Sequence, residues 1–405
     1  MIKRVMIVSP VVPYPSLSGN SVRVAQLIQI FRELGAEVHF VLCPIAAISD
    51  RRVGDEMHSE FGSFYTELNS GDISTGRWWQ ALLDFAKKRL KLKKITWFFD
   101  FMFADGFITS RMQKDFQSLV NRVRPDAVIC EYVLLSKLVE GLDSETLTLV
   151  DTHDRFAERN TRIRQEDGQG LWWSLSRQQE RHLLSRFDRV IAIQENEEKM
   201  FMKDLADSAG KVMTLDIIAP ALRQTYIQPD SPVIGFIGSQ NMHNRQGLSV
   251  FLQCHWANIK HLVPNTILHV AGAIFEDIQA ENFDGVIFLG RVDDLSEFYD
   301  QCSIIINPCL TGTGLKIKSV EALAHGKPLV STPEGAEGLS FILDKGVYVS
   351  DLKAIEFATT CVNLLTTKTK RQNMGEQAIT LINLRYNESR KAIIHLLGES
   401  SVAVS

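Results

Sequence analysis

A glycine-bearing loop between a buried strand and a helix is the part of this sequence best able to bind phosphate. Residues 303–307 are apolar and β-branched and predict a buried strand. The loop 311–314 follows, and then a helix is predicted over 316–325, because Gly326 and Pro328 end it. The first turn of such a helix has unpaired backbone N–H groups, and these attract an anion.

Two lysines stand at the positive end of this predicted helix. Lys316 and Lys318 are unfavourable there unless an anion lies between them, because the helix dipole repels cations at that end. Glu321 follows about one turn later and is placed to accept hydrogen bonds from vicinal hydroxyl groups such as those of a ribose. The alternative is an ordinary surface helix with solvated lysines. The pattern favours a site for phosphate and sugar groups.

The sequence around these residues resembles the donor-binding motif of a known enzyme family. Residues 314–339 are similar to that motif in the GT-B glycosyltransferases of family 4, in the branch with a GTGLKIK-type donor loop. Four further segments resemble the same family in the same order along the chain: 5–41, 233–244, 267–273 and 286–299. The resemblance therefore spans most of the chain. It implies a retaining transferase that uses a nucleotide-diphosphate sugar.

The resemblance also assigns residues to the donor site. The expected donor-binding residues are Gly19, Asn20, Gly238, Ser239, Arg291, Val292, Thr313, Gly314, Leu315, Lys316, Lys318 and Glu321. The first glutamate of the family motif is missing, since its position falls on Thr313 or on Thr311 depending on the alignment. The family's arginine and lysine after the first turn of this domain are missing as well. Neutralisation of the phosphate is then left to Lys316 and Lys318, and no metal ion or cofactor is expected.

The loop after the predicted strand 146–151 carries the candidate catalytic residues of the first half. With the two lysines, the candidates are Asp151, His153, Asp154, Lys316 and Lys318. A lone histidine is more often structural, held here by a neighbouring aspartate. The resemblance instead favours a histidine that hydrogen-bonds a sugar hydroxyl or orients the acceptor. Arg155, Arg159 and Arg162 follow at near-helical spacing and either bind an anionic acceptor or are solvated.

The elements that must position these residues alternate between strands and helices. Strands are predicted over 127–131, 146–151 and 212–218, among others. Such alternation predicts α/β domains with parallel sheets. The length of 405 residues predicts two domains, joined near the proline-bearing stretch 219–232. We expect two Rossmann-like domains that face each other across a cleft, as in the GT-B fold: an acceptor domain over 1–220 and a donor domain over 221–384. The resemblance implies a last helix within 382–397 that crosses back to the first domain, so that 385–405 pack on that domain.

Composition and motifs exclude several functional classes. A net charge of −4 argues against a nucleic-acid binder. The six cysteines contain no C-x-x-C pair and the ten histidines form no ligand cluster, so we expect reduced thiols and no metal site. The first strand is not followed by G-x-G-x-x-G, which excludes a plain NAD-dependent dehydrogenase. No run approaches the ~18 apolar residues of a membrane span, and a cytoplasmic location is expected.

A second unusual segment, 77–103, combines basic and aromatic residues. Lys87, Lys91 and Lys94 recur in it at helical spacing. One interpretation is a helix on an anionic membrane surface, which would place the protein peripherally on the inner face of the cell membrane and suit a lipid-linked acceptor. The other is a helix whose apolar face packs on the first domain while its lysines are solvated. Both stay open at this point.

The predicted function is therefore transfer of a hexose from a nucleotide-diphosphate donor to a glycan or lipid-linked acceptor, in cell-surface polysaccharide or glycoconjugate synthesis. Two alternatives use the same architecture. One is a catalytically weak or inactive protein that binds nucleotide sugars. The other is a nucleotide-sugar epimerase or a sugar-phosphate synthase.

Overall fold

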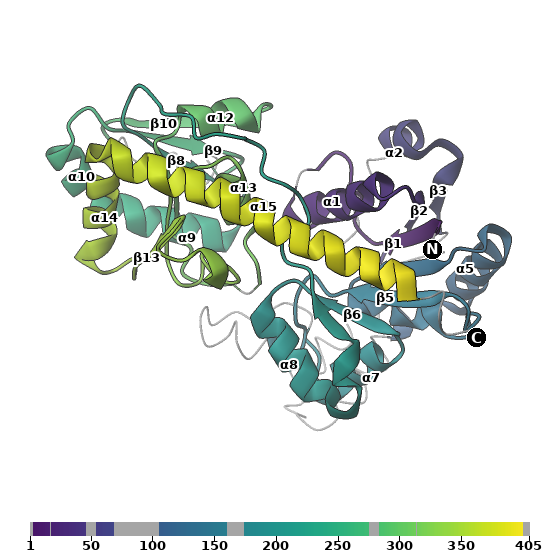
Figure 1. Cartoon of the computed structure of the whole chain (residues 1–405). Coiled ribbons are helices and arrows are strands. Elements are labelled where there is room, and N and C mark those ends of the chain that lie inside the picture. The colour runs from purple at the N-terminus through teal and green to yellow at the C-terminus, as the bar shows by residue number, and fades with distance from the viewer. Residues whose placement is uncertain are drawn as a thin grey trace, which may run out of the picture. The chain divides into compact units, whose positions relative to one another are not determined.

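The computed structural model describes residues 3–16, 18–45, 54–68, 105–159, 174–274, 283–312 and 314–399. The segment 77–103, Arg162 and Thr313 lie outside the described residues. The chain divides into two compact units, Met1–Ile218 with Arg390–Ser405 and Ala219–Ser389 (Figure 1). Each unit is an α/β domain with its own parallel sheet, so the predicted fold class is confirmed.

The sheet of unit 1 has seven strands in the order β3-β2-β1-β4-β5-β6-β7, and every neighbouring pair is parallel. The strands are β1 Arg4–Ser9, β2 Glu37–Leu42, β3 Tyr65–Glu67, β4 Ala127–Glu131, β5 Leu147–Asp151, β6 Arg189–Ala192 and β7 Val212–Thr214. β1 and β4 are buried along almost their whole length, as their continuous apolar runs predict. Along the chain, β2 and β3 are added on one side of β1, whereas β4 and the later strands are added on its other side. The loops after these two strands therefore form the switch point at which open parallel sheets bind ligands.

The helices of unit 1 begin and end where the local sequence provides caps. They are α1 Gly19–Glu33, α2 Gly54–Phe61, α5 Ser110–Val123, α7 Arg177–Ser185 and α8 Glu195–Leu205, with the short 3₁₀ helices η1 Gly62–Phe64, η2 Val133–Val139 and η3 Ala206–Lys211. The Thr109 side chain caps α5 by accepting the N–H of Met112 (3.1 Å), and Arg124 ends it in the left-handed conformation. Ser176 and Gln179 cap α7 reciprocally. These contacts satisfy backbone groups that a helix end leaves unpaired.

The sheet of unit 2 has six strands in the order β10-β9-β8-β11-β12-β13, again all parallel. The strands are β8 Val233–Ile237, β9 Ile267–Ala271, β10 Val286–Gly290, β11 Ile304–Asn307, β12 Leu329–Ser331 and β13 Val347–Val349. Phe236 of β8 packs in the core of this unit with Phe251 and Phe357. The order reverses between β8 and β11. The second switch point therefore contains the loop that the sequence predicts to bind phosphate.

The last helix of unit 2 is longer than the sequence predicts. The helices are α9 Met242–Phe251, the π-helical segment η4 Leu252–Trp256, α10 Ala257–Leu262, α12 Leu295–Gln301, α13 Ile317–Ala324, the 3₁₀ helix η5 Ser340–Ile342, α14 Ile355–Thr366 and α15 Lys368–Glu399. The helix expected near 382–397 is the end of α15, and the boundary between the units falls inside this helix, after Ser389. In its interior, a Cβ atom on Gly375 would collide with Tyr226 and with the Gly326 carbonyl. Glycine is unfavourable inside a helix, but at this position it lets α15 pack closely against those two residues.

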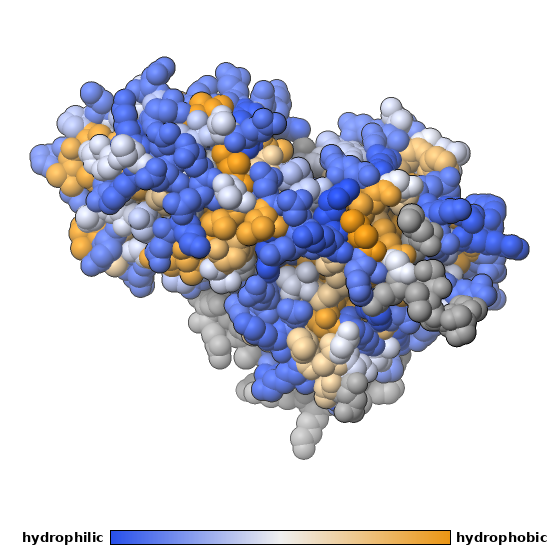
Figure 2. Space-filling view, viewed as in Figure 1, coloured by the Kyte–Doolittle hydropathy of each residue, from blue (hydrophilic) through white to orange (hydrophobic). Residues whose placement is uncertain are grey.

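The surface of the described helices gives no sign of a membrane-spanning element. None of them is both long enough and apolar enough to cross a bilayer. The face shown in Figure 2 is largely hydrophilic, with separate apolar patches. The predicted membrane contact through 77–103 lies outside the described residues and stays a prediction.

Candidate functional site

The switch point of unit 2 brings the loop after β8 close to the loop after β11. Asn241 begins α9 by accepting the N–H of Asn244 on its side-chain oxygen (2.8 Å). Gly247, further along α9, faces the Pro308 carbonyl of the β11 loop, where a Cβ atom would collide. The glycine allows α9 to approach the β11 loop more closely than any other residue would. The two loops can thus share hydrogen bonds.

The β11 loop has the backbone of an anion site. Gly312 and Gly314 have φ angles of 104° and 81°, which favour glycine. α13 begins at Ile317, and its N-cap residue Lys316 makes no side-chain hydrogen bond to the first turn. A helix N-terminus that no side chain caps keeps the N–H groups that bind phosphate in many proteins. The start of α13 lies within one residue of the predicted helix start, and phosphate binding by the loop stays a prediction.

Lys318 stands in this site without a counter-ion. Its Nζ donates to Oδ1 of Asn244 (2.7 Å) and lies 4.9 Å from the centre of the Phe236 ring. Both partners are uncharged, and no carboxylate in the described part of the chain pairs with this lysine. Burial is the main cause that lowers the pKa of Lys318 to about 8, and the neighbouring Lys316 acts in the same direction. The site thus contains a half-buried positive charge that an anion would compensate.

Lys316 turns back onto its own loop. Its Nζ donates to the carbonyl of Gly314 (2.7 Å) and lies 3.8 Å from the carboxylate of Glu337. Leu315 is buried, so its side chain belongs to the packing of the unit and only its backbone is suited to a ligand. An anion in the loop would compete with Glu337 for the Lys316 ammonium group.

Two residues of α9 join this site although the sequence analysis did not select them. The ring Nδ1 of His243 is hydrogen-bonded to the hydroxyl of Thr311. Asn244 donates to the Ser239 carbonyl (3.0 Å) while it accepts from Lys318, so it links the β8 loop to the lysine. Both residues directly follow the turn after β8, where the sequence analysis noted that the family's cations are missing. That position was the signal that could have identified them.

Glu321 has an environment that suits a ligand contact. Burial raises its pKa to about 7, and the nearby Tyr299 hydroxyl opposes this rise. The Tyr299 ring stacks on His325, with 4.4 Å between the ring centres, so it is held in place. The carboxyl group of Glu321 is therefore harder to ionise than that of an exposed glutamate. Hydroxyl groups of a ligand that donate to it would favour its charged form.

Arg291 and Val292 lie in the loop directly after β10. Arg291 is exposed and Val292 is half-buried. In the sheet, β9 lies between β10 and β8. Arg291 and Val292 therefore lie at the same edge of the sheet as the β11 loop, but two strands away from β8. No hydrogen bond or ion pair among the described residues connects them to Lys316 or Lys318. Their predicted contact with a nucleotide base stays a prediction.

In unit 1, Asp151 is a fully buried member of an ion pair. It ends β5, and its two oxygens accept from the guanidinium group of Arg23 at 2.7 and 2.9 Å. Arg23 also donates to the Leu215 carbonyl (2.9 Å). The geometry favours a structural role for Asp151, since both of its oxygens are already used. The nearby Asp154 is likewise paired, with Arg159 at 2.9 Å.

His153 belongs to a second buried pair beside the first. Its Nε2 is hydrogen-bonded to Glu131, the last residue of β4, which the sequence analysis did not select. The imidazole stacks on Tyr132, with ring centres 4.3 Å apart and an interplanar angle of 13°. Asn20 donates to the Tyr132 hydroxyl (3.0 Å), and Gly19 begins α1 beside it. The β1–β4 switch point thus assembles Asn20, Tyr132 and His153 as one group.

Glu131, Asp151 and His153 bring three potential metal-ligand atoms within 4.8 Å of one another. Residues of these types bind zinc and similar ions in other proteins. Here Arg23 already places a positive charge on both oxygens of Asp151. A divalent ion would have to displace that arginine, so we interpret the cluster as an ion-pair network.

Solved structures share this architecture over almost the whole chain. Sucrose-phosphate synthase from Thermosynechococcus elongatus is similar with a TM-score of 0.68 and 14% sequence identity, and the match covers 100% of both chains. The lipopolysaccharide outer core galactosyltransferase WaaB matches with a TM-score of 0.59 and 12% identity, over 96% of this chain and 99% of that one. The fold is that of the GT-B glycosyltransferases. HepE from Anabaena, solved in complex with UDP, matches this GT-B fold with a TM-score of 0.63 and 13% identity, over 98% and 100% of the chains.

The sequence of unit 2 matches a family of the same kind. Residues 231–367 match the family model described as glycosyl transferases group 1. This range includes the turn after β8, Lys316 and Lys318 at the start of α13, and Glu321. No sequence among the curated proteins matches the chain. The family match and the GT-B fold together support a transferase.

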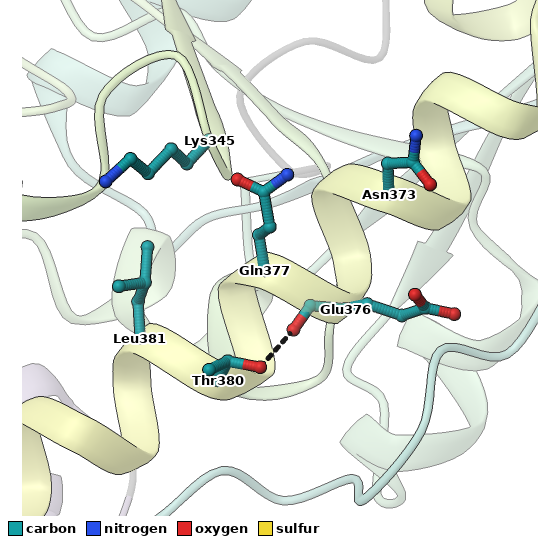
Figure 3. A pocket seen from close by; sticks show the side chains of 6 residues that line it. All are labelled: Lys345, Asn373, Glu376, Gln377, Thr380 and Leu381. Atoms are coloured by element: carbon teal, nitrogen blue, oxygen red, sulfur yellow. Dashed lines mark hydrogen bonds between the residues drawn. The ribbon is translucent and has the colours of Figure 1, made fainter.

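Unit 2 also has a hollow that lies apart from the candidate site residues. It lies along α15, where the Thr380 hydroxyl donates to the Glu376 carbonyl (2.9 Å) (Figure 3). Its lining residues are Lys345, Asn373, Glu376, Gln377, Thr380 and Leu381. None of the predicted site residues lines it.

Proposed function

We propose that this protein is a retaining glycosyltransferase that moves a hexose from a nucleotide-diphosphate donor to a glycan or lipid-linked acceptor. The observation that carries this proposal is the half-buried ammonium group of Lys318, whose described partners, Asn244 and Phe236, are both uncharged. A buried charge without a counter-ion is unfavourable, so a site that keeps one is suited to receive an anion. A diphosphate has the charge to satisfy this lysine and oxygens to accept from the N–H groups of the β11 loop.

The same groups would accelerate the transfer. As the bond between the anomeric carbon and the diphosphate breaks, the sugar becomes cation-like and the leaving phosphate gains negative charge. Lys316, Lys318 and the loop N–H groups would then stabilise the transition state more than the ground state. Two fixed cations can take the place that a metal ion has in other transferases. Retention of configuration, with the leaving phosphate helping to deprotonate the acceptor, follows from the family resemblance.

The names of similar structures support the substrate class. HepE was solved with UDP-glucose, and WaaB is a lipopolysaccharide galactosyltransferase. We extend this to a hexose donor and a cell-surface glycan or glycoconjugate, with Glu321 on the ribose and Arg291 and Val292 beside the base. His153 would hydrogen-bond a sugar hydroxyl or orient the acceptor. A cytoplasmic location with peripheral membrane contact through 77–103 completes the proposal.

A thermal-shift panel of nucleoside diphosphates and their sugars tests the donor site first. Ligand at about 100 times its dissociation constant should stabilise the protein by about 2.7 kcal/mol. Nucleotide release with candidate acceptors then tests turnover. If no nucleoside diphosphate stabilises the protein, the donor-site assignment is wrong. Stabilisation without any release would favour the inactive-binder alternative.

The affinity for a nucleoside diphosphate should depend on pH with a maximum between about 7 and 8. Below about 7, Glu321 becomes protonated, so that one of its oxygens becomes a donor and the group accepts hydrogen bonds from a ribose more weakly. Above about 8, Lys318 loses the charge that binds the phosphate. The affinity should then fall by up to about tenfold for each pH unit on either side. Isothermal titration calorimetry from pH 5.5 to 9.5 measures this profile.

Two substitutions test which residue causes the fall in affinity on each side of the pH profile. Glu321→Gln should weaken binding at pH 7.5 and abolish the decline at low pH, because an amide does not titrate. Lys318→Met should abolish the decline at high pH for the same reason. An unchanged acid side in Glu321→Gln would remove Glu321 from the ribose site.

A further inference from the structure

Asn244 joins the two loops of the candidate donor site in unit 2, and the proposed chemistry gives it no role. It lies in the first turn of α9 and is 7% exposed. Its Oδ1 accepts from Nζ of Lys318 (2.7 Å), and its Nδ2 donates to the Ser239 carbonyl (3.0 Å). Lysine only donates and a carbonyl only accepts, so these two partners allow one orientation of the amide. The side chain of Asn244 is therefore fixed by its contacts.

The backbone of Asn244 is held in place as well. Its N–H donates to Oδ1 of Asn241, the residue that caps α9 (2.8 Å). Three residues later, Gly247 lies so close to the Pro308 carbonyl that a Cβ atom would collide with it. The start of α9 is thus tied to the turn after β8 and packs closely on the β11 loop. Residue 244 therefore has a defined position relative to Lys318.

The two lysines at the start of α13 have different partners. Nζ of Lys316 lies 3.8 Å from the carboxylate of Glu337. The described partners of Lys318 are the Asn244 amide and, at 4.9 Å, the Phe236 ring, and both are uncharged. A buried ammonium group is usually paired with a carboxylate, because an unpaired charge is costly to bury. The amide at position 244 orients Lys318 as a carboxylate would, but does not neutralise it.

We propose that Asn244 is a positioning residue that directs the Lys318 ammonium group toward the donor phosphate and, because it is neutral, leaves the charge available to that phosphate. An aspartate at this position has nearly the same shape but would form an ion pair with Lys318 and repel an anion. The identity of residue 244 thus makes the site selective for an anion. This role rests on the proposed function, which supplies the phosphate as part of a nucleotide-diphosphate donor.

Asn244→Asp in the full-length protein tests whether the neutrality of this residue matters for anion binding. The affinity for inorganic pyrophosphate, measured by isothermal titration calorimetry at pH 7.5, should fall by about tenfold or more, because the new carboxylate neutralises Lys318 and repels the anion. A control for the substitution itself is needed, because the aspartate also loses the hydrogen bond to the Ser239 carbonyl. The protonation of Lys318 provides that control.

The titration of Lys318 separates the effect of charge from a disturbance of the structure. Burial lowers the pKa of Lys318 to about 8, Lys316 acts in the same direction and Cys309 opposes it. NMR of carbon-13-labelled lysine side chains against pH follows this group, and Lys318→Met identifies its signal. In Asn244→Asp the midpoint should rise by about one pH unit or more, because an adjacent carboxylate favours the ammonium form. A merely structural role of Asn244 would not raise this midpoint while the affinity falls.

Asn363→Asp is the matched control. Asn363 is exposed near the end of α14, and its Oδ1 also accepts from a lysine, Lys370 (2.9 Å). This variant places the same new charge beside a lysine that is not part of the candidate site. It should leave both the pyrophosphate affinity and the Lys318 midpoint unchanged.

Asn244→Leu is a second variant, which also serves if the aspartate variant does not fold. Leucine has a similar shape but makes neither hydrogen bond. The Lys318 midpoint should fall, because the oxygen that stabilises the ammonium form is gone, and the pyrophosphate affinity should fall more at pH 8.5 than at pH 6.5. Undiminished affinity in either variant, or a Lys318 midpoint that does not rise in Asn244→Asp, would overturn the proposal. If both measurements respond as expected but the unmodified protein releases no nucleotide from any sugar donor, the role of Asn244 in anion binding stands and the proposed function fails.

Discussion

Replacing Lys318 with alanine should lower turnover by about 10²-fold or more at saturating donor. The lysine has no carboxylate partner among the described residues, so its whole charge is available to the phosphate that leaves. That charge matters most when the bond to the anomeric carbon breaks, because negative charge on the phosphate is then largest. Measuring the rate at saturating donor separates the effect on the chemical step from any loss of donor affinity. Nucleotide release under single-turnover conditions measures it.

Lys345→Ala is the matched control for this experiment. Lys345 is an exposed lysine of the same unit and lines the hollow along α15, away from the β11 loop. Its removal should leave turnover within about twofold, because an exposed charge in water has little effect at a distance. A Lys318→Ala variant with the turnover of Lys345→Ala would exclude the lysine from the chemical step.

Replacing Arg23 with leucine should lower the free energy of unfolding by about 3–5 kcal/mol. The guanidinium group holds both oxygens of Asp151 in the interior of unit 1, and the two side chains are 4% and 0% exposed. Leucine keeps much of the packing volume but leaves the Asp151 carboxylate buried without a partner. Urea denaturation followed by circular dichroism at neutral pH measures the loss.

Two further variants separate the buried charge from other effects of the substitution. Adding Asp151→Asn to Arg23→Leu should recover part of the stability, because the uncompensated charge is then gone. Arg177→Ala removes an exposed pair with Glu158 (3.0 Å) and should cost about 1 kcal/mol or less. If Arg23→Leu is as mild as Arg177→Ala, the buried pair does not stabilise unit 1.

The elements that position the site could be predicted where the local sequence decides them. β4 was predicted at its observed bounds, and α13 differs by one residue at each end, because apolar runs and glycine or proline stops are local signals. β7 is shorter than the predicted 212–218. Among the described residues it pairs with β6, whose last residue, Ala192, lies opposite Thr214. The ladder between the two strands therefore ends there, apart from the N–H of Leu215, which the Ala192 carbonyl accepts.

The pairs that define the site could not be predicted in the same way. Glu131 and His153 are 22 residues apart, Asn244 and Lys318 are 74 apart, and Arg23 and Asp151 are 128 apart. Each pair forms because of the order in which strands are placed in a sheet, and that order is not a property of any local segment. One member of each pair, His153, Lys318 or Asp151, is recognisable in the sequence by its chemistry and its place after a strand. The other member became visible only with the fold.

The division of the chain inside α15 has a consequence for biosynthesis. A nascent polypeptide leaves the ribosome amino end first, and domains generally fold in the order in which they emerge. The first 218 residues emerge before unit 2, but the segment from Arg390 onward, which belongs to the same unit, emerges after it. Unit 1 is therefore the first to be made and the last to be completed, and a transcript that ends early would leave the nascent protein with an unfinished amino-terminal domain.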